Sequence, residues 1–431
     1  MLGARAAVLV VPPTIYLISN FHRVAPAVVA ADLMKAFSIT ASSLGALAAI
    51  YPYVFAVMAL VAGSLVETLG PRLTISSGAL AMAIGAVLFG LAPAFGVAIA
   101  GRLLVGLGAS VILIAWLALA AEWYRPQRFA TISGWTQTVG NIGALVASSP
   151  LALAVEAIGW RSTFVLVGAV TLLPALASLL LVRDRPDAAG SPVVNREPRR
   201  AGASIADVFT SIPAIVTNPR SWPPVLVAAC VYATLISLLG LWGVPYLTQI
   251  YGFGRIAAAN TVAWLAVGIV IESPLVGWLS DRRLGRRKLP FVVSTALYAA
   301  CWLVLTAPGA ARPHPALLAP LFLFMGLTAS GLILVWACVR EVNNPAHVGI
   351  VIGFCNAPIF LAFAMIQWLT GAVLDATWTG LDAGGVRIYS EAGYRTAFGV
   401  CLALAAGSLV MSLFVTETRC RNIWRRGAHW R

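Results

Sequence analysis

Residues 277–288 read Gly277-Trp-Leu-Ser-Asp281-Arg282-Arg283-Leu-Gly285-Arg286-Arg287-Lys288. A degenerate copy begins 214 residues earlier and reads Gly63-Ser-Leu-Val-Glu67-Thr-Leu-Gly70-Pro-Arg72. Each copy follows one long apolar run and precedes another, which predicts a short polar hairpin between two membrane helices. Because the hairpin recurs near the middle of each half, the sequence predicts a chain built from two equivalent helical bundles.

The composition is that of a helical membrane protein. Hydrophobic residues make up 60% of the chain and charged residues only 10%, against about 45–50% and about 25% in soluble domains. Hydrocarbon accepts only helices or closed barrels, because every backbone polar group has to be paired internally. The apolar runs are long and continuous, whereas barrel strands are ~10-residue segments of alternating hydrophobicity. The predicted fold class is therefore an all-α membrane protein.

Twelve segments fit spanning helices, each of which needs about 20 mostly apolar residues. They lie near residues 7–31, 43–67, 72–91, 96–121, 129–153, 161–182, 224–249, 256–280, 289–309, 316–340, 348–374 and 395–416. We interpret the first as a retained signal-anchor, since cleavage there would leave an odd number of helices and spoil the repeat.

These segments predict a chain of two pseudo-symmetric six-helix bundles, residues 1–182 and 224–416. Between them, residues 183–223 are rich in Arg and Pro and form a predicted cytoplasmic linker, in which residues 205–215 can form a short amphipathic helix. Residues 417–431 form a basic cytoplasmic tail. The other loops are short and leave no room for a soluble catalytic domain, so we do not predict an enzyme.

The formal net charge of +14 is distributed unevenly between the two sides of the membrane. With the amino terminus inside, 21 Lys and Arg residues fall on the inner side and 6 in the outer loops. This bias follows the positive-inside rule and predicts a plasma (inner) membrane protein with both termini in the cytoplasm. The placement favours contact with anionic lipid and argues against nucleic-acid binding.

Six scattered cysteines show neither metal-binding nor redox spacing. Most lie in predicted spans, and we interpret them as buried packing thiols. The sequence predicts no metal, no cofactor and a monomer.

The motifs resemble those of a known family over essentially the whole chain. The second hairpin is similar to the signature Gly-x-Leu-x-Asp-Arg-x-Gly-Arg-Arg of the major facilitator superfamily, while the first has Glu67 and Thr68 in place of Asp and Arg. The stretch Arg102-Leu-Leu-Val-Gly106-Leu-Gly108 resembles the second motif of that family, and Gly159-Trp160-Arg161 resembles another of its elements. The resemblance implies a two-bundle transporter that works by alternating access.

Within the superfamily, the first helix resembles anion:cation symporters and related organic-anion and nitrate carriers. The stretch Asn20-Phe21-His22-Arg23-Val24-Ala25-Pro26-Ala27 lies where those proteins place an arginine that meets the substrate anion. Two departures stand out: predicted spans seven and eight have no second central arginine, and Gly140-Asn141-Ile-Gly143 replaces the proline-containing antiporter motif of span five. The second departure disfavours a drug antiporter.

Arg23 is the predicted substrate-binding residue. A charge near the bilayer centre costs at least ~2.5–3.5 kcal/mol on insertion scales, so it needs a partner or a purpose. Tyr16, Asn20 and Arg23 are spaced four and three apart and share one helix face. A guanidinium stays charged, and its planar fork suits a carboxylate, phosphate or nitrate. The alternative is a structural arginine that pairs with backbone carbonyls or extends outward.

His22 adjoins Arg23 but points about 100° away on a helix, so it is either a proton relay and substrate neighbour or a packed neutral imidazole. Four amide side chains are predicted either to line the substrate cavity or to hydrogen-bond neighbouring helices. They are Gln137 and Asn141 on span five, and Asn356 and Gln367 on span eleven.

Glu272 is the only acid well inside a predicted span. Because a low-dielectric environment disfavours a charged carboxylate, this residue can bind and release a proton during transport. Pairing with Arg23 would favour the charged form, and an anion that arrives at Arg23 would then free the acid to take up a proton. The alternative is a fixed tether or an acid that faces a wet vestibule.

The two hairpins, residues 63–72 and 277–288, are predicted to act as a gate. Gly63 and Gly277 would permit close helix approach, while Glu67 and Asp281 can accept bonds from arginines and from a helix amino terminus. The predicted gating residues are Gly63, Glu67, Arg72, Arg102, Gly277, Asp281, Arg282 and Arg286. The alternative is that these residues only shape the loops and set the topology.

The sequence thus predicts a secondary active transporter that moves a small organic anion, of the carboxylate type, together with protons. Two alternatives stay open. One is an efflux antiporter for an amphipathic or cationic compound, with Glu272 facing the cation. The other is a receptor or scaffold on the same fold that does not transport.

Overall fold

The computed structural model describes residues 2–59, 61–124, 126–184, 216–307, 312–329, 331–344 and 348–424. Residues 185–215, which include the predicted amphipathic helix, and residues 425–431 of the predicted tail lie outside the described part. Nine helices within that part are long and apolar enough to cross a membrane. They are Ala41–Met58, Pro71–Gly90, Phe95–Trp123, Thr138–Leu181, Trp222–Tyr251, Arg255–Leu284, Lys288–Thr306, Phe354–Ala376 and Glu391–Leu413.

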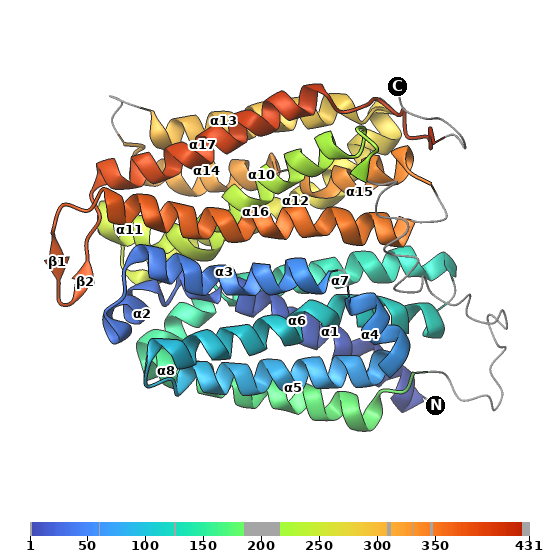
Figure 1. Cartoon of the computed structure of the whole chain (residues 1–431), viewed down its shortest axis with the longest axis horizontal. Helices are drawn as coiled ribbons and strands as arrows, with labels where there is room; N and C mark the ends of the chain where they lie inside the picture. Colours follow the sequence, from blue (N-terminus) through green and yellow to red (C-terminus); the bar gives the residue numbers. More distant parts are fainter. Residues whose placement is uncertain are drawn as a thin grey trace. The chain divides into compact units, whose positions relative to one another are not determined.

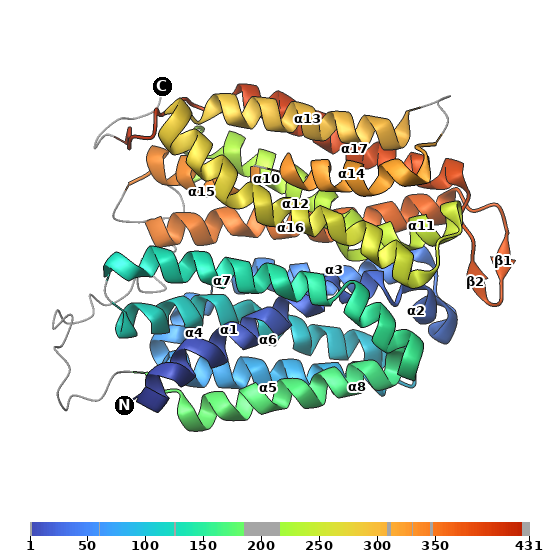
Figure 2. The same ribbon diagram turned by 180° about the vertical axis from the view of Figure 1, so that it is seen from behind.

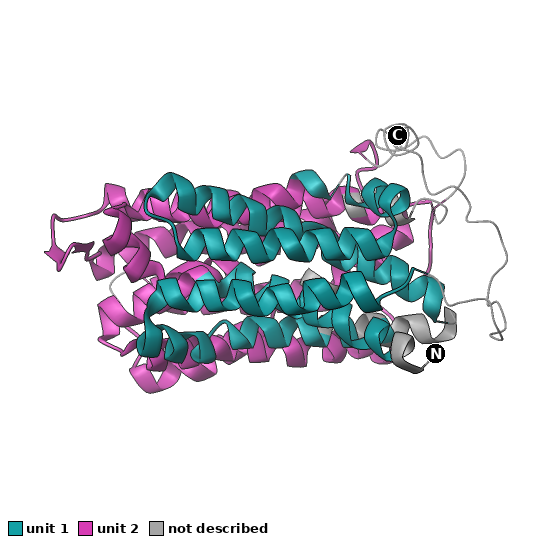
Figure 3. Cartoon of the chain, turned by 90° about the horizontal axis from the view of Figure 1, so that it is seen from below, with its two compact units in different colours: residues 1–25, 57–207 teal, residues 26–56, 208–431 magenta. Residues whose placement is uncertain are grey.

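The chain forms two compact units, which Figure 3 shows in different colours. Unit 1 comprises residues 1–25 and 57–207, and unit 2 comprises residues 26–56 and 208–431. Residues 26–56 therefore group with unit 2, although the predicted amino-terminal bundle contains them. The chain crosses from unit 2 back into unit 1 near the end of one helix, α3.

Unit 1 is built around α5 and α6, which pack side by side, with α8 on the other side of α5 and α7 against α1 (Figures 1 and 2). Its helices are α1 (Leu2–Val24), α4 (Ala62–Leu69), α5 (Pro71–Gly90), α6 (Phe95–Trp123), α7 (Pro126–Val146) and α8 (Ser149–Leu181). α8 joins the end of predicted span five to span six, and Gly159 breaks it with a φ of 77°. Only glycine adopts such a backbone readily, since it has no Cβ.

Unit 2 contains the remaining spans. Its elements are α2 (Ala30–Phe37), α3 (Ala41–Met58), α10 (Trp222–Ser237), η2 (Leu238–Trp242), α11 (Gly243–Tyr251), α12 (Arg255–Trp278), η3 (Leu279–Leu284), α13 (Lys288–Thr306), α14 (Pro315–Leu327), α15 (Gly331–Val342), α16 (Val348–Ala376), β1 (Asp382–Ala383), β2 (Val386–Arg387) and α17 (Glu391–Leu413). α10 packs against α15, α16 and α17, and α12 packs against α14. β1 and β2 form an antiparallel hairpin that pairs Asp382 with Arg387.

Every predicted span coincides with one helix or with consecutive helices, but several boundaries differ. Predicted span one continues to residue 31, whereas α1 ends at Val24 and a single 3₁₀ turn, Ala25–Ala27, follows. The break falls there because Pro26 has no N–H to continue the helix. The first hairpin turns only at Gly70, whose φ is 82°, and the second only at Gly285, whose φ is 57°.

Candidate functional site

The predicted substrate face of α1 packs against α7 within unit 1. The Nδ2 of Asn20 donates a hydrogen bond to the carbonyl of Tyr16 at 2.9 Å, and Asn20 is buried. A Cβ added to Gly140 of α7 would lie 2.5 Å from a ring carbon of Tyr16 and 3.0 Å from the Asn20 Nδ2. Glycine at this position therefore lets α7 cover Tyr16 and Asn20, while Arg23, near the end of α1, is only partly buried.

His22 and Arg102 form a structural junction in unit 1. The Nη1 of Arg102, on α6, donates a 2.8 Å hydrogen bond to the carbonyl of His22. That carbonyl would ordinarily accept from the N–H four residues later, which is missing because residue 26 is proline. Arg102 is 2% exposed and supplies the absent donor. The structure shows Arg102 bonded to the end of α1. A role of Arg102 in gating stays a prediction.

The His22 ring is packed among aromatic side chains. Its centroid lies 5.5 Å from that of Phe21, in an edge-on arrangement, and 6.4 Å from that of Phe164 on α8. The side chain is buried, and its Nε2 makes no hydrogen bond to the residues that the structure describes. His22 is therefore a buried imidazole packed against two phenyl rings, and the choice between its two predicted roles stays open.

The predicted amides lie in both units. In unit 1, Asn141 is partly buried, and the side chain of Gln137 lies outside the described part of the structure. In unit 2, Asn356 is partly buried on α16 and Gln367 is almost fully buried three turns further along. Among the described residues, none donates a hydrogen bond to the Gln367 Oε1.

Glu272 is fully buried in α12 of unit 2. Neither of its carboxylate oxygens accepts a hydrogen bond from a described residue. One turn earlier, a Cβ added to Gly268 would clash with the backbone of α14 at the Leu323 carbonyl. Glu272 therefore lies on the packed face of α12, as an acid inside a membrane span with no described hydrogen-bond partner.

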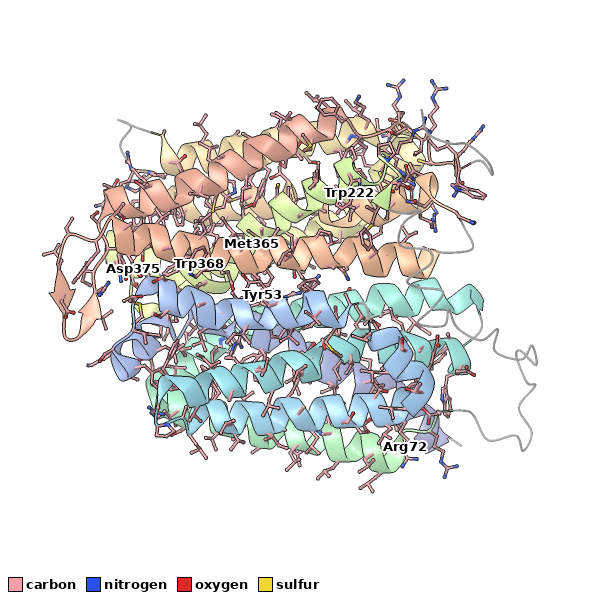
Figure 4. The ribbon with its side chains drawn as sticks, viewed as in Figure 1. Tyr53, Arg72, Trp222, Met365, Trp368 and Asp375 are labelled. Carbon is pink, nitrogen blue, oxygen red and sulfur yellow. The ribbon has the colours of Figure 1, made fainter. Side chains whose placement is uncertain are left out.

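In unit 1, the acid that holds the hairpin is Asp184, which the sequence reasoning missed. Its Oδ1 accepts the backbone N–H of Arg72 at 2.7 Å and so caps the amino terminus of α5. The Arg72 guanidinium, labelled in Figure 4, donates to the carbonyl of Leu179 through Nε at 3.1 Å and also through Nη2. Glu67, the predicted acceptor, is exposed. Asp184 follows α8 directly, where only the tertiary fold brings it to α5.

The predicted close approach at the two hairpin glycines is not seen among the described residues and stays a prediction. A Cβ added to Gly63 or Gly277 would meet no described atom within 4 Å. Gly63 is exposed on the surface of α4, and no described atom of unit 1 lies against it. The glycines at which described helices do approach closely lie elsewhere, in the helix interiors.

In unit 2, the hairpin arginine that makes the contacts is Arg287, whereas the predicted Arg282 and Arg286 are exposed. The Nη1 of Arg287 donates to Asp281 at 2.5 Å, and its Nη2 donates to Glu341, at the end of α15, at 2.7 Å. The side chains of Arg287 and Glu341 are 6% and 4% exposed, against 57% for Asp281. The buried pair is therefore Arg287 with Glu341, and Asp281 is an outer partner.

The segment after α17 completes this cluster. Thr418 donates through Oγ1 to the Glu341 carboxylate at 2.5 Å. The Glu417 carboxylate accepts the backbone N–H groups of Arg287 at 2.9 Å and Lys288 at 3.0 Å, which caps the start of α13. Partial burial raises the pKa of Glu417, but these N–H groups and that of Arg419 lower it by more, so the net pKa lies below its ordinary value.

The sequence carried only weak signals for these three residues. Glu341 is an acid directly after a predicted span, and Glu417 and Thr418 follow the last span. Nothing local shows that they converge on Arg287, because 54 residues separate Arg287 from Glu341 and 130 separate it from Glu417.

Known proteins are similar to this chain both in sequence and in structure. The chain is 24% identical to the membrane sensor protein UhpC of Escherichia coli (strain K12) over 357 residues, which are 78% of each chain. It is 25% identical to the probable sulfoacetate transporter SauU of Cupriavidus necator over 271 residues, 62% of this chain and 63% of that one.

A solved structure has the same fold. The crystal structure of a bacterial homolog to the human lysosomal transporter Spinster, in an inward-facing and unoccupied conformation, superposes with a TM-score of 0.80. The superposition covers 98% of this chain and 99% of that one at 18% identity. The profile of the Major Facilitator Superfamily matches residues 14–282 and 244–426. The chain belongs to the Major Facilitator Superfamily, whose members are multi-pass transporters of the membrane.

Proposed function

We propose that this transporter moves a small organic anion of the carboxylate type, together with protons, by alternating access. The observation that carries the proposal is the position of Arg23 near the end of α1, on one face with Asn20 three residues earlier and Tyr16 seven residues earlier. Arg102, the other intramembrane arginine of unit 1, is buried against a backbone carbonyl, whereas Arg23 is only partly buried. Its guanidinium offers a fixed charge and a planar fork to a carboxylate.

The relatives support an anionic substrate. SauU is named a probable sulfoacetate transporter, and sulfoacetate is a small organic anion by its chemistry. The resemblance of the first helix to organic-anion carriers points to the same substrate class.

Glu272 is the proposed proton site. It is the acid that lies fully buried within α12, without a hydrogen bond from a described residue. Intramembrane carboxylates of this kind commonly belong to proton relays. Because a carrier changes the surroundings of such a group between its states, the carboxyl can load and release a proton during each cycle.

The first experiment is a thermal-shift screen of the purified protein against organic acids, phosphate esters, nitrate and amphipathic cations. The stabilising compound is then used for uptake into proteoliposomes driven by a pH gradient. Arg23→Ala is expected to lower uptake about tenfold or more, because a hydrogen bond to a charged group is worth about 1.5–3 kcal/mol. Arg312→Ala, which removes an exposed arginine of unit 2, is the matched control. Undiminished uptake by the Arg23→Ala variant would refute the anion role.

The proton role has its own test. Glu272→Gln is expected to abolish accumulation driven by the pH gradient while exchange of labelled for unlabelled substrate continues. Thr261→Ala is the control on the same helix, since the Thr261 hydroxyl donates to the Ala257 carbonyl within α12. Accumulation by the Glu272→Gln protein at the parent's level would exclude this residue as the coupling site.

A second candidate function is that of a ligand sensor, which the similarity to the membrane sensor protein UhpC favours. The two functions differ in one measurement. A sensor would be stabilised by its ligand in the thermal-shift screen but would neither accumulate nor exchange that ligand in proteoliposomes. If the stabilising compounds are amphipathic cations instead of anions, the hypothesis of an efflux antiporter is favoured, and uptake of the cation into inverted vesicles tests it.

A further inference from the structure

Asp375, in the last turn of α16, gathers five hydrogen bonds within unit 2. Its Oδ2 accepts from the backbone N–H of Ser42 at 2.8 Å and from the Ser42 hydroxyl at 2.5 Å. Its Oδ1 accepts from the Ala41 N–H at 3.1 Å, the Tyr389 hydroxyl at 2.8 Å and the Arg387 Nη1 at 3.2 Å. Ala41 and Ser42 begin α3, so one carboxylate of α16 caps the amino terminus of another membrane helix.

Below this cap, α3 and α16 touch backbone to backbone. A Cβ added to Gly45 would clash with the carbonyl of Gln367, and one added to Gly371 would clash with the carbonyl of Ala41. Small residues allow such an approach between membrane helices. This seam, formed by residues 41–45 and 367–375, is closed tightly at the Asp375 end.

Further along, the same two helices meet through aromatic rings. Tyr51 stacks on Phe55 with centroids 4.7 Å apart, and Phe55 stacks on Phe360 of α16 at 4.9 Å. Phe55 and Phe360 are partly exposed, whereas Gly371 and Gln367 are buried. The contact between α3 and α16 therefore loosens with distance from Asp375.

The elements around Asp375 lie at one end of unit 2. Figure 4 labels Asp375 at the end of α16 nearest the β1–β2 hairpin, and Figures 1 and 2 show α2 and α11 at that same end. There, Arg255 at the start of α12 pairs with Asp32 of α2 at 2.8 Å. Gln249 of α11 accepts the Tyr389 N–H at 3.1 Å, which holds the hairpin beside Asp375. The positive-inside rule predicts that this end faces outward.

We propose that Asp375 is the releasable latch of the outer gate. The proposal rests on alternating access and on neither the substrate nor the proton site. α3 is tied to α16 at its first residues, yet the chain leaves unit 2 for unit 1 at residues 56 and 57 of the same helix. Any outward opening that parts α3 from α16 must break the bonds to Asp375 first. Of the four hydrogen bonds that Ala41 and Ser42 donate here, three go to Asp375 and one goes from the Ala41 N–H to the Tyr389 hydroxyl. Release of this one carboxylate therefore removes most of the polar contacts at the start of α3.

The test uses a cysteine reporter inside the seam. Ala48 lies seven residues after Ala41 and three after Gly45, which places all three on one face of α3, and it is 3% exposed. Intact cells that express the Ala48→Cys protein are treated with a membrane-impermeant maleimide. The parent protein without the reporter gives the background from the native cysteines. Leu381→Cys, at a position 59% exposed beside the hairpin, verifies that the reagent reaches this end from outside.

Asp375→Asn keeps the side-chain volume and removes the charge that the donors require. It is expected to raise the labelling rate of the reporter about tenfold or more, since several charge-assisted bonds are lost together. Asp382→Asn is the matched control, because Asp382 lies in the hairpin and accepts only from Gly385 N–H among the described residues. It should leave the rate unchanged. The measurement needs no substrate, so it stands even if the proposed anion transport fails.

Labelling that stays at the parent's rate in Asp375→Asn, while Leu381→Cys reacts, overturns the latch. An equal rise in Asp382→Asn also overturns it, since that outcome would mean general loosening of the hairpin. Should Asp375→Asn fail to elute as a monodisperse peak, Ser42→Ala provides the second variant. It removes one of the five bonds, and it is expected to give a smaller rise; no rise in a monodisperse Ser42→Ala protein counts against the proposal.

Discussion

Arginine side chains in this protein take their roles from the acceptors that the fold brings to them. Arg102 replaces a hydrogen bond that Pro26 removes from α1. Arg287 joins the buried Glu341 to the exposed Asp281. Each guanidinium offers five donors in a rigid plane, so it can tie together two or three chain segments at once. The residue type alone therefore does not show whether an arginine joins chain segments or binds the substrate.

Glu341→Gln is expected to destabilise unit 2 by about 3 kcal/mol or more, because loss of one partner leaves a buried charge uncompensated. Thermal unfolding in detergent, followed by intrinsic fluorescence, should show a midpoint lower by about 5 °C or more. Asp281→Asn is the control, since Asp281 is exposed and solvent screens its pair. Equal losses in the two variants would contradict the assignment of Glu341 as the principal partner of Arg287.

The depressed pKa of Glu417 predicts a pH dependence of stability. A carboxyl whose folded pKa lies below its unfolded value contributes stability that is complete above the unfolded value and is lost as pH falls through the folded one. The ordinary value is 4.5, so the unfolding midpoint should fall on acidification from about pH 5 to about pH 3. Glu417→Gln should flatten that fall, whereas Glu156→Gln, at an exposed position of α8, should not. A parent-like slope in Glu417→Gln would argue against the cap.

At the scale of helices, paired glycines on α5 and α6 allow these two helices of unit 1 to pack closely together. Gly78 and Gly85 on α5 are seven residues apart, as are Gly101 and Gly108 on α6. A Cβ on Gly85 would lie 2.7 Å from the Gly101 carbonyl, and one on Gly78 would lie 2.8 Å from the Gly108 carbonyl. The antiparallel helices thus approach backbone to backbone at two levels, as small residues permit in membranes.

Gly108→Ala is expected to destabilise the protein, since its Cβ would clash with the backbone of α5 at Gly78. Gly407→Ala in α17 meets no described atom within 4 Å. There, alanine should be neutral or should stabilise by up to about 1 kcal/mol, because glycine is the poorer helix former. The unfolding midpoints of the two variants should therefore move in opposite directions. A shift of the same sign in both would contradict the close approach of α5 and α6.

At the scale of the whole molecule, the charge bias predicts which side of the membrane each loop faces. The carboxyl terminus is expected in the cytoplasm and the β1–β2 hairpin outside. Green fluorescent protein fused after Arg431 should fluoresce, whereas alkaline phosphatase fused there should be inactive. Alkaline phosphatase inserted at Gly384, in the hairpin, should be active. Activity in the reverse pattern would invert the topology and, with it, the assignment of the Asp375 end as outer.

The features that the sequence alone predicts are those that depend on residues close together in the chain. All twelve predicted spans coincide with helices, because hydrophobicity over about 20 residues is a local property that decides membrane insertion. The resemblance of the hairpins was enough to predict the family, which the profile match confirms. The face shared by Tyr16, Asn20 and Arg23 likewise follows from helical spacing alone.

Tertiary structure decided which acids and arginines meet. Asp184 and not Glu67 caps α5, Arg287 and not Arg282 holds the second hairpin, and Asp375 caps α3 from the far end of the chain. Hydrogen bonds and ion pairs act over a few ångströms between segments that lie tens to hundreds of residues apart. Their partners are therefore set by how the helices pack, which the order of residues along the chain does not state.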